Sequence, residues 1–220
     1  RLDQAVIKDR QRFVQETLKS LEETLRDAYG INQNARADAQ ARSQGMDYLV
    51  TQLSKLAFSD AEPGKSALKG IAVIATGGYG RSELSPHSDI DLLFAIDGKR
   101  LQQGPEELQY LSQSVLYPWW DAGLTVGHAV RSVTESIKFG QTDMTSRSAL
   151  LDHRFLWGDR DFFRSYIKRI ERDLFNKGKK DFVGFKLAEL AERRRRTGTA
   201  VYRNEPELKD GEGGLRDALF

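Results

Sequence analysis

The hydrophobic and polar positions of the chain follow two periods, which predict helices at both ends and a small sheet between them. From Arg1 to Tyr29, apolar residues recur every three or four positions, so we expect an amphipathic helix that ends near Gly30. A second apolar stripe of this period runs from Met46 to Ala57 and ends before the Glu62-Pro63-Gly64 breaker. Residues 32–43 are polar and rich in alanine, which suits either a loop or a weak helix.

The middle of the chain reads as β-structure. The run Ile71 to Ala75 is apolar throughout and bounded by glycines, which favours a buried strand over a helix. Asp89 to Ile96 and Leu124 to Arg131 are the next expected strands, and Pro105 suits the first turn of a helix between them. The order strand, turn, strand, helix, strand predicts an α+β fold, in which a small mixed sheet has helices before and after it.

The elements after the third strand are expected to be mainly helical. Ser132-x-x-Glu135 is a candidate capping box for a short helix. We expect a helix over 142–151, an extended segment over 153–159, and apolar helical faces over 162–174 and 182–191. The predicted organisation is an N-terminal helical segment (1–64), a core (65–140) and a second helical segment (141–220).

Composition and charge exclude several classes of protein. The 34 basic and 32 acidic side chains give a net charge of +2, so the whole chain has no polyanion-binding signature. The absence of cysteine excludes disulfides and thiolate metal sites and is compatible with a reducing cytoplasm, which we expect as the location. No apolar run reaches membrane-spanning length, and the N-terminus shows no signal-peptide core, so we expect no membrane partner.

The turn after the first strand has the composition of an anion-binding loop. Gly77, Gly78 and Gly80 leave the backbone open to close approach, and a group of free amide N–H donors favours phosphate oxygens. Arg81 adds a permanent positive charge. Taken alone, these glycines also fit an ordinary loop, and the Gly78-x-Gly80-x-x-Glu83 spacing lacks the third glycine of a dinucleotide fingerprint.

Asp89 and Asp91 are the sharpest chemical signal. In a strand, side chains alternate between faces, so the two carboxylates share one side while Ile90 points into the core. Two carboxylates on one face repel unless a divalent cation lies between them, and oxygen ligands favour magnesium, often with nucleotide phosphates. This predicts nucleotidyl transfer. An Asp-x-Asp by itself is also common at a solvated strand end, so the inference depends on its combination with the glycine turn.

Together these residues resemble a known family. The stretch GGYGRSELSPHSDIDLL, residues 77–93, is similar to the signature of polymerase-β-like nucleotidyltransferases, and more narrowly to that of bacterial protein-PII uridylyltransferases. The stretch KDGEGGLRD, Lys209 to Asp217, resembles a second motif of the same family. The family protein is much longer and carries hydrolase and ligand-sensing domains, so we expect this chain to be a fragment of it.

The resemblance implies a reaction and a set of residues. The reaction is transfer of UMP from UTP to a tyrosine of a PII-type nitrogen regulatory protein, with release of pyrophosphate. Asp89 and Asp91 are the implied magnesium ligands, with Mn²⁺ as an alternative ion. The implied nucleotide contacts are Gly77, Gly78, Arg81, Ser88, Gly213, Gly214, Arg216 and Asp217.

One feature departs from the superfamily pattern. Many members carry a third carboxylate on the strand after the helix, but Leu124 to Arg131 offers only His128 and Arg131. Asp143 either approaches the site as the missing ligand or caps a helix that begins at Met144. His128 either touches phosphate or acceptor, or has a structural role.

Two other functions stay open at the sequence level. The first is a nucleotidyltransferase with another nucleotide or acceptor, because no residue of the signature is assigned to recognition of the nucleotide base. The second is a nucleotide-sensing module without catalysis, which the missing carboxylate makes credible. The basic run Arg193 to Arg196 suits a solvated helix face or an anion-steering surface. No aromatic residues interleave with these arginines, which argues against nucleic acid as a partner.

Overall fold

The computed structural model describes residues 4–61, 69–103, 105–197 and 207–218, and the chain divides into two compact units, residues 1–170 and 171–220. The expected domain boundaries at residues 64 and 140 stay predictions. The Glu62-Pro63-Gly64 breaker lies outside the described residues. The elements of the first unit are α1 (Gln4–Asn32), α2 (Ala35–Ala61), β1 (Ile71–Thr76), α3 (Gly77–Gly80), β2 (Ile90–Ile96), α4 (Gly98–Gln103), α5 (Pro105–Asp121), β3 (Val126–Ser132), α6 (Val133–Thr142), α7 (Met144–Ala149), β4 (His153–Gly158) and α8 (Arg160–Ile170). Those of the second are the π-helix η1 (Glu171–Asn176), α9 (Lys179–Thr197) and α10 (Leu215–Ala218).

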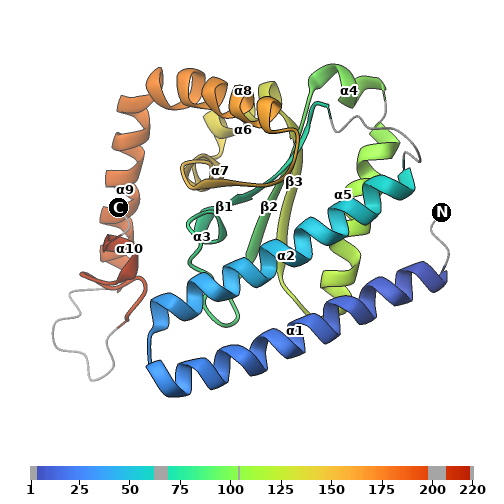
Figure 1. Ribbon diagram of the computed structural model, residues 1–220. Coiled ribbons are helices and arrows are strands. Elements are labelled where there is room, and N and C mark those ends of the chain that lie inside the picture. The colour runs from blue at the N-terminus through green and yellow to red at the C-terminus, as the bar shows by residue number, and fades with distance from the viewer. Residues whose placement is uncertain (1–3, 62–68, 104, 198–206, 219–220) are drawn as a thin grey trace. The chain divides into compact units, whose positions relative to one another are not determined.

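The first unit is built on a four-stranded mixed sheet in the order β3-β2-β1-β4. Strand β1 is antiparallel to both β2 and β4, whereas β2 and β3 are parallel. The parallel pair needs a crossover, and α4 and α5 supply it (Figure 1). The predicted fold class, a small mixed sheet with flanking helices, is therefore confirmed. The expected extended segment after α7 is β4, which joins the sheet through β1.

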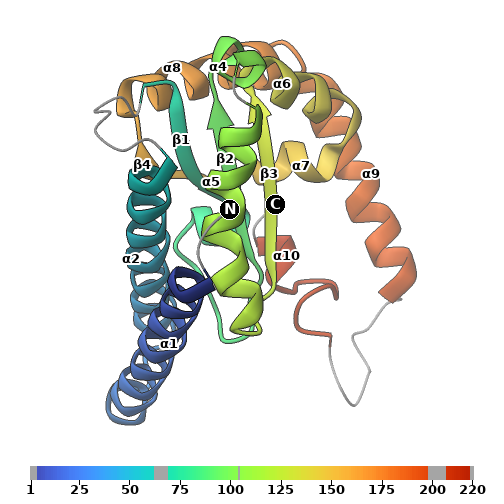
Figure 2. The same ribbon diagram turned by 90° about the vertical axis from the view of Figure 1, so that its right-hand side faces the viewer.

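The two faces of the sheet carry different helices. Figure 1 shows α5 on one side of the sheet and α6, α7 and α8 on the other, and Figure 2 shows α5 in front of the strands. Helix α2 packs against α5 and β4, and α1 packs against α2. None of the helices in the described part of the chain is long and apolar enough to cross a membrane.

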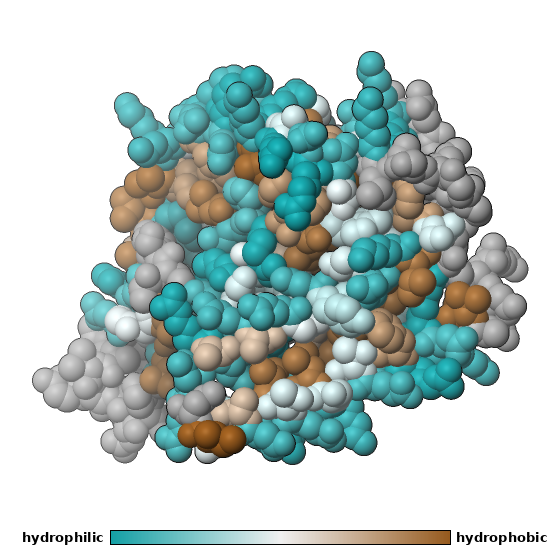
Figure 3. Space-filling view, viewed as in Figure 1, coloured by the Kyte–Doolittle hydropathy of each residue, from teal (hydrophilic) through white to brown (hydrophobic). Residues whose placement is uncertain are grey.

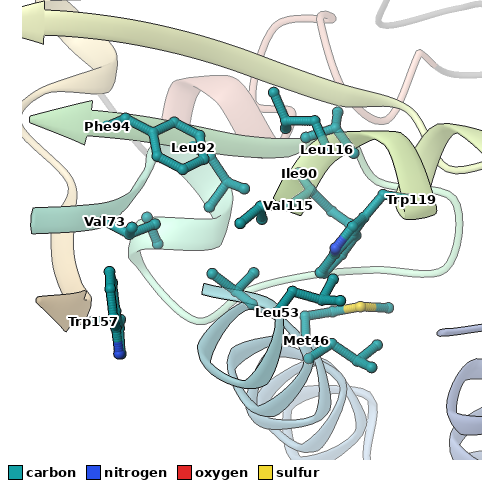
Figure 4. Close-up of a cluster of buried hydrophobic side chains, with 14 of the residues drawn as sticks. Met46, Leu53, Val73, Ile90, Leu92, Phe94, Val115, Leu116, Trp119 and Trp157 are labelled. Atoms are coloured by element: carbon teal, nitrogen blue, oxygen red, sulfur yellow. The ribbon is translucent and has the colours of Figure 1, made fainter. Parts of the chain in front are cut away.

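The main core lies between the sheet and the layer of α2 and α5. Alternate residues of the strands face this layer, as the period of two requires, and meet the apolar stripes of both helices. Figure 4 shows Leu53 of α2 and Trp119 of α5, both fully buried, in one cluster with Leu92 and Ile90 of β2. This core fixes the strands so that the residues on their opposite face, Asp91 among them, are held in place.

The structure decides one alternative that the sequence left open and shortens one expected helix. Residues 35–43 are helical and belong to α2, where Asn34 Oδ1 accepts a hydrogen bond from the Ala37 N–H at 3.1 Å. The helix expected over 142–151 is shorter, because α6 continues to Thr142 and α7 covers only Met144–Ala149.

The capping box before α6 is confirmed. The Glu135 N–H donates to Ser132 Oγ at 3.3 Å, and the Ser132 N–H donates to Glu135 Oε2 at 2.7 Å. This reciprocal pair satisfies two backbone donors at the start of the helix and ends β3 at Ser132.

Candidate functional site

The candidate site forms where β1 ends and β2 begins. Because the two strands are antiparallel, with Ala75 opposite Leu92, the end of β1 and the start of β2 lie together. The chain leaves β1 through Gly77, whose φ of 59° is in the left-handed region that glycine adopts without strain. A β-carbon on Gly77 would lie 3.1 Å from Oδ2 of Asp91. The first residue of the glycine turn and the second aspartate are thus neighbours.

The two aspartates have different environments. Asp89 lies just before β2 and is exposed, whereas Asp91 lies within β2 and is half-buried. Burial raises the pKa of the Asp91 carboxyl above its usual value, and the nearby negative charge of Asp89 raises it further. The mutual repulsion inferred from the sequence is therefore present. A divalent cation between the two carboxylates would relieve it, so the donor set fits a hard cation such as Mg²⁺.

Strand β3 supplies a residue that the sequence analysis did not select. Gly127 pairs with Asp91 in the parallel register, and a β-carbon on Gly127 would lie 2.5 Å from Oδ1 of Asp91. The Asp91 carboxylate therefore lies between Gly77 and Gly127. A glycine inside a predicted strand was the available signal, because such a residue often marks the close approach of another group.

Of the two roles expected for Asp143, the structure shows the helix cap. Asp143 closes α6 and caps α7, and its Oδ2 accepts a hydrogen bond from the Ser146 N–H at 3.1 Å. A hydrogen bond from the Ser146 side chain is the main cause of the lowered pKa of Asp143, and the backbone N–H groups of Ser146 and Thr145 lower it further. Within the described residues, no group of three or more His, Cys, Asp or Glu side chains is arranged to hold a metal ion. The assignment of Asp89 and Asp91 as metal ligands stays a prediction.

Arg81 is held at the end of the glycine turn by two carboxylates. Its Nε donates to Glu83 at 2.7 Å and its Nη1 to Asp152 at 2.6 Å. Its Nη2 lies 3.8 Å from the place of a β-carbon on Gly78, so the guanidinium reaches back over the turn. Ser88 lies in the exposed loop before β2 and accepts a hydrogen bond from the Ser85 N–H at 3.1 Å. Nucleotide contacts of these residues stay predictions.

His128 and Arg131 of β3 both contact aromatic rings. His128 packs edge-on against Trp120, with ring centroids 5.4 Å apart, and pairs with Leu92, so it lies on the sheet face opposite Asp91. The guanidinium carbon of Arg131 lies 3.8 Å from the centroid of the Phe139 ring. The structural role for His128 is therefore favoured over contact with phosphate.

The predicted residues near the C-terminus belong to the second unit. Asp217 accepts hydrogen bonds from the Gly213 N–H at 3.0 Å and from Arg193, while Arg216 forms an ion pair with Asp210 at 2.9 Å. Gly214 packs against the carbonyl oxygens of Leu208 and Gly211, each 2.9 Å from the place of a β-carbon.

The basic run divides between two roles. Arg195 and Arg196 pair with Glu192 on an exposed helix face, as expected of a solvated run. Arg193 and Arg194 instead contact Asp217 and so hold the segment that contains the second motif.

A cavity of about 920 Å³ lies in the first unit, and its lining includes Ser88 and Ile90 but not Asp91. Helices α1 and α2, the loop before β2 and the α5–β3 loop line it, and Figure 3 shows hydrophobic residues between α1 and α2 on a mainly hydrophilic face. Its charged lining residues include Arg42, which forms ion pairs with Glu22 and Asp38.

Comparison with known proteins finds similarity to PII-uridylyltransferases in two ways, through a family model and through curated relatives. A family model described as GlnD PII-uridylyltransferase matches residues 181–220. A bifunctional uridylyltransferase/uridylyl-removing enzyme of Bradyrhizobium sp. strain BTAi1 is 46% identical over 152 residues, which cover 69% of this chain and 16% of the relative. Proteins of the same name from Nitrobacter hamburgensis and Azospirillum brasilense are each 43% identical, over 77% and 78% of this chain and 18% of each relative.

The chain spans less than a fifth of the length of these curated relatives. The crystal structure of a toxin–antitoxin with AMP-PNP aligns with 66% of this chain and 93% of its own, at a TM-score of 0.29 and 14% identity. That likeness is too low to bear on fold or function.

Proposed function

Because the chain is related in sequence to the PII-uridylyltransferase family, we propose that its first unit is the nucleotidyltransferase part of such an enzyme. One observation carries this proposal: the Asp91 carboxylate lies next to Gly77 of the glycine turn and near the negative charge of Asp89. A phosphate-binding turn and a pair of carboxylates at one point of a rigid sheet are what nucleotidyl transfer requires.

Each residue of the site has a role in the proposal. Asp89 and Asp91 hold Mg²⁺ or Mn²⁺, because both offer hard oxygen donors. When bound, the ion neutralises charge on the phosphate oxygens. The backbone of Gly77 and Gly78, the Arg81 guanidinium and the Ser88 hydroxyl orient the triphosphate. For Gly213, Gly214, Arg216 and Asp217, nucleotide binding stays a prediction that depends on the family resemblance.

The proposed reaction is an in-line displacement at phosphorus. The hydroxyl oxygen of a tyrosine on a PII-type protein forms a bond to the α-phosphorus of UTP. The bond between that phosphorus and the oxygen bridging to the β-phosphorus breaks, so pyrophosphate leaves and the tyrosine proton passes to solvent. The contribution of this chain is position and charge, because phosphoryl transfer depends mainly on both.

Calorimetric titration tests the proposal. UTP, ATP, GTP and CTP are added to the chain with Mg²⁺ and with the ion chelated, and Asp89→Asn and Asp91→Asn are measured beside the wild type. We expect a preference for UTP that needs Mg²⁺ and is lost in both variants. Asp161→Asn is the matched control, because Asp161 is an exposed aspartate at the start of α8 whose ion partner is Arg164.

The outcomes separate the three candidate functions. Binding that ignores both the metal ion and the two aspartates contradicts the assigned site. A preference for another nucleotide supports a different nucleotidyltransferase. UTP binding without transfer to a PII-type protein, by a wild-type chain that includes the hydrolase and sensor parts, supports a nucleotide sensor.

A further inference from the structure

The glycine turn is held by an arginine that lies far from it in the sequence. Arg154 of β4 donates through Nη2 to the carbonyl oxygen of Tyr79 at 3.0 Å, within α3. The same Nη2 donates to Asp47 Oδ1 at 3.0 Å, and Nη1 donates to Asp47 Oδ2. One guanidinium therefore connects α2, α3 and β4, and its bidentate contact with Asp47 fixes the plane from which it reaches the turn.

The surroundings of Arg154 favour a specific geometry over a loose surface contact. Arg154 pairs with Ala75 in the sheet, two residues before Gly77, so its backbone position is fixed by strand pairing. The side chains of Arg154 and Asp47 are 27% and 26% exposed. The Tyr79 ring is fully buried, and the guanidinium carbon lies 5.3 Å from its centroid.

The residues just before Arg154 hold the other end of the turn. Gly80 packs against the carbonyl group of Asp152, whose oxygen lies 2.2 Å from the place of a β-carbon, so no side chain fits there. Asp152 Oδ2 also accepts the 2.6 Å hydrogen bond from Arg81. The start of β4 thus contacts the turn at Tyr79, Gly80 and Arg81, and the turn moves only if these contacts break.

We propose that Arg154 is a positioning residue of the nucleotide site. It sets the place of the Gly77–Gly80 turn by joining the Tyr79 carbonyl to Asp47, so α2 contributes to the site although it supplies no ligand. A displacement of α2 would be transmitted to the turn through this guanidinium. The expected change in nucleotide affinity rests on the proposed function. The restraint on the turn does not, because it can be measured without any nucleotide.

Two substitutions test the role of Arg154. In Arg154→Lys, a single ammonium group can keep the charge pair with Asp47 but cannot also hold the Tyr79 carbonyl in a fixed plane. In Asp47→Asn, the guanidinium keeps the carbonyl contact but loses its charged partner. We expect UTP to bind on the order of tenfold more weakly to Arg154→Lys and by a smaller factor to Asp47→Asn. Amide hydrogen exchange at residues 78–81 should become faster in both.

Arg42→Lys is the matched control for a general loss of stability. Arg42 is a buried arginine of the same unit, and its ion pairs with Glu22 and Asp38 join α1 to α2 rather than α2 to the turn. At a temperature where all variants are folded, we expect Arg42→Lys to leave both UTP affinity and exchange at residues 78–81 unchanged. Equal effects of Arg42→Lys and Arg154→Lys would show a merely structural role and overturn the proposal.

The double variant Asp47→Asn/Arg154→Lys completes the test. If the two residues act as one unit, the double variant should bind UTP no more weakly than Arg154→Lys alone. Additive losses, or unchanged exchange at residues 78–81 in Arg154→Lys, would contradict the positioning role. A wild-type chain that binds no nucleotide would instead contradict the proposed function, and exchange would then decide the role of Arg154 by itself.

Discussion

The carboxylate of Asp91 lies directly over Gly127: a β-carbon at position 127 would come within 2.5 Å of Oδ1 of Asp91. The two residues pair across the parallel strands β2 and β3, so the separation is fixed by the sheet. Because Oδ1 fills the space where a side chain would begin, position 127 cannot carry a third carboxylate. The absence of side-chain atoms at Gly127 instead allows Asp91 its observed orientation.

Gly127→Ala is expected to damage the site while leaving the fold intact. The added methyl group must displace the Asp91 carboxylate, which should weaken Mg²⁺-dependent UTP binding by about tenfold or more. Gly98→Ala is the control, because its β-carbon would lie 4.0 Å from Ser132 Cβ, an ordinary contact. Calorimetry and thermal unfolding would be measured on both. Unchanged binding in Gly127→Ala would show that the Asp91 orientation does not matter.

Asp143 offers a test of capping against metal binding. Asp143→Ser keeps an oxygen that can accept the Ser146 N–H but removes the carboxylate, so we expect UMP transfer to be retained. Asp143→Ala removes the cap and should lower the free energy of unfolding by about 1 kcal/mol. Transfer assays and urea unfolding distinguish the two effects. Loss of transfer in the folded Asp143→Ser variant would identify Asp143 as a ligand after all.

Asp159 gives a prediction for the dependence of stability on pH. The Phe162 N–H donates to Asp159 Oδ1 at 2.9 Å and the Gly70 N–H donates to Oδ2 at 3.0 Å, and the first of these bonds is the main reason that the pKa of Asp159 is lowered. A lowered pKa means that the ionised carboxylate stabilises the folded state above the ordinary aspartate pKa of about 3.9. This stabilisation is lost as the pH falls through the lowered value.

Asp159→Asn should therefore unfold at lower urea concentration than the wild type at pH 7. The difference between the two should shrink as the pH falls below the ordinary aspartate pKa, because the wild-type carboxyl is then protonated as well. Urea titrations at several pH values measure it. A difference that stays constant at all pH values would show that the charge of Asp159 has no part in stability.

Asp217 is expected to hold the second motif in place. Its carboxylate accepts from the Gly213 N–H, the main cause of its lowered pKa, and pairs with Arg193 and Arg194. Asp217→Asn should speed amide hydrogen exchange over residues 211–217. Glu192→Gln, which removes the exposed pairs with Arg195 and Arg196, should change it little. Weaker UTP binding without faster exchange would instead favour a direct nucleotide contact.

The sequence by itself determined the local elements of the site. The apolar run of β1, the glycine turn and the Asp-x-Asp at the start of β2 are contiguous, and each depends on short-range patterns of side chains. The capping box at Ser132 and the extended segment of β4 were readable for the same reason. The alternation of side chains along β2 was enough to place Ile90 in the core and Asp91 on the other face.

Only the tertiary structure decided which distant residues meet at that site. The parallel register places Gly127 under Asp91, and the pairing of β4 with β1 brings Arg154 to Tyr79 and to Asp47, which is 107 residues away along the chain. Local periodicity sets the face that each side chain takes, whereas the pairing of strands far apart in the sequence depends on how the core packs. Asp143 shows the same limit, since only the position of the Ser146 N–H distinguished a cap from a ligand. The glycine turn and the two aspartates could therefore be identified from the sequence. The residues that hold them in place, Gly127 and Arg154, were decided by long-range packing.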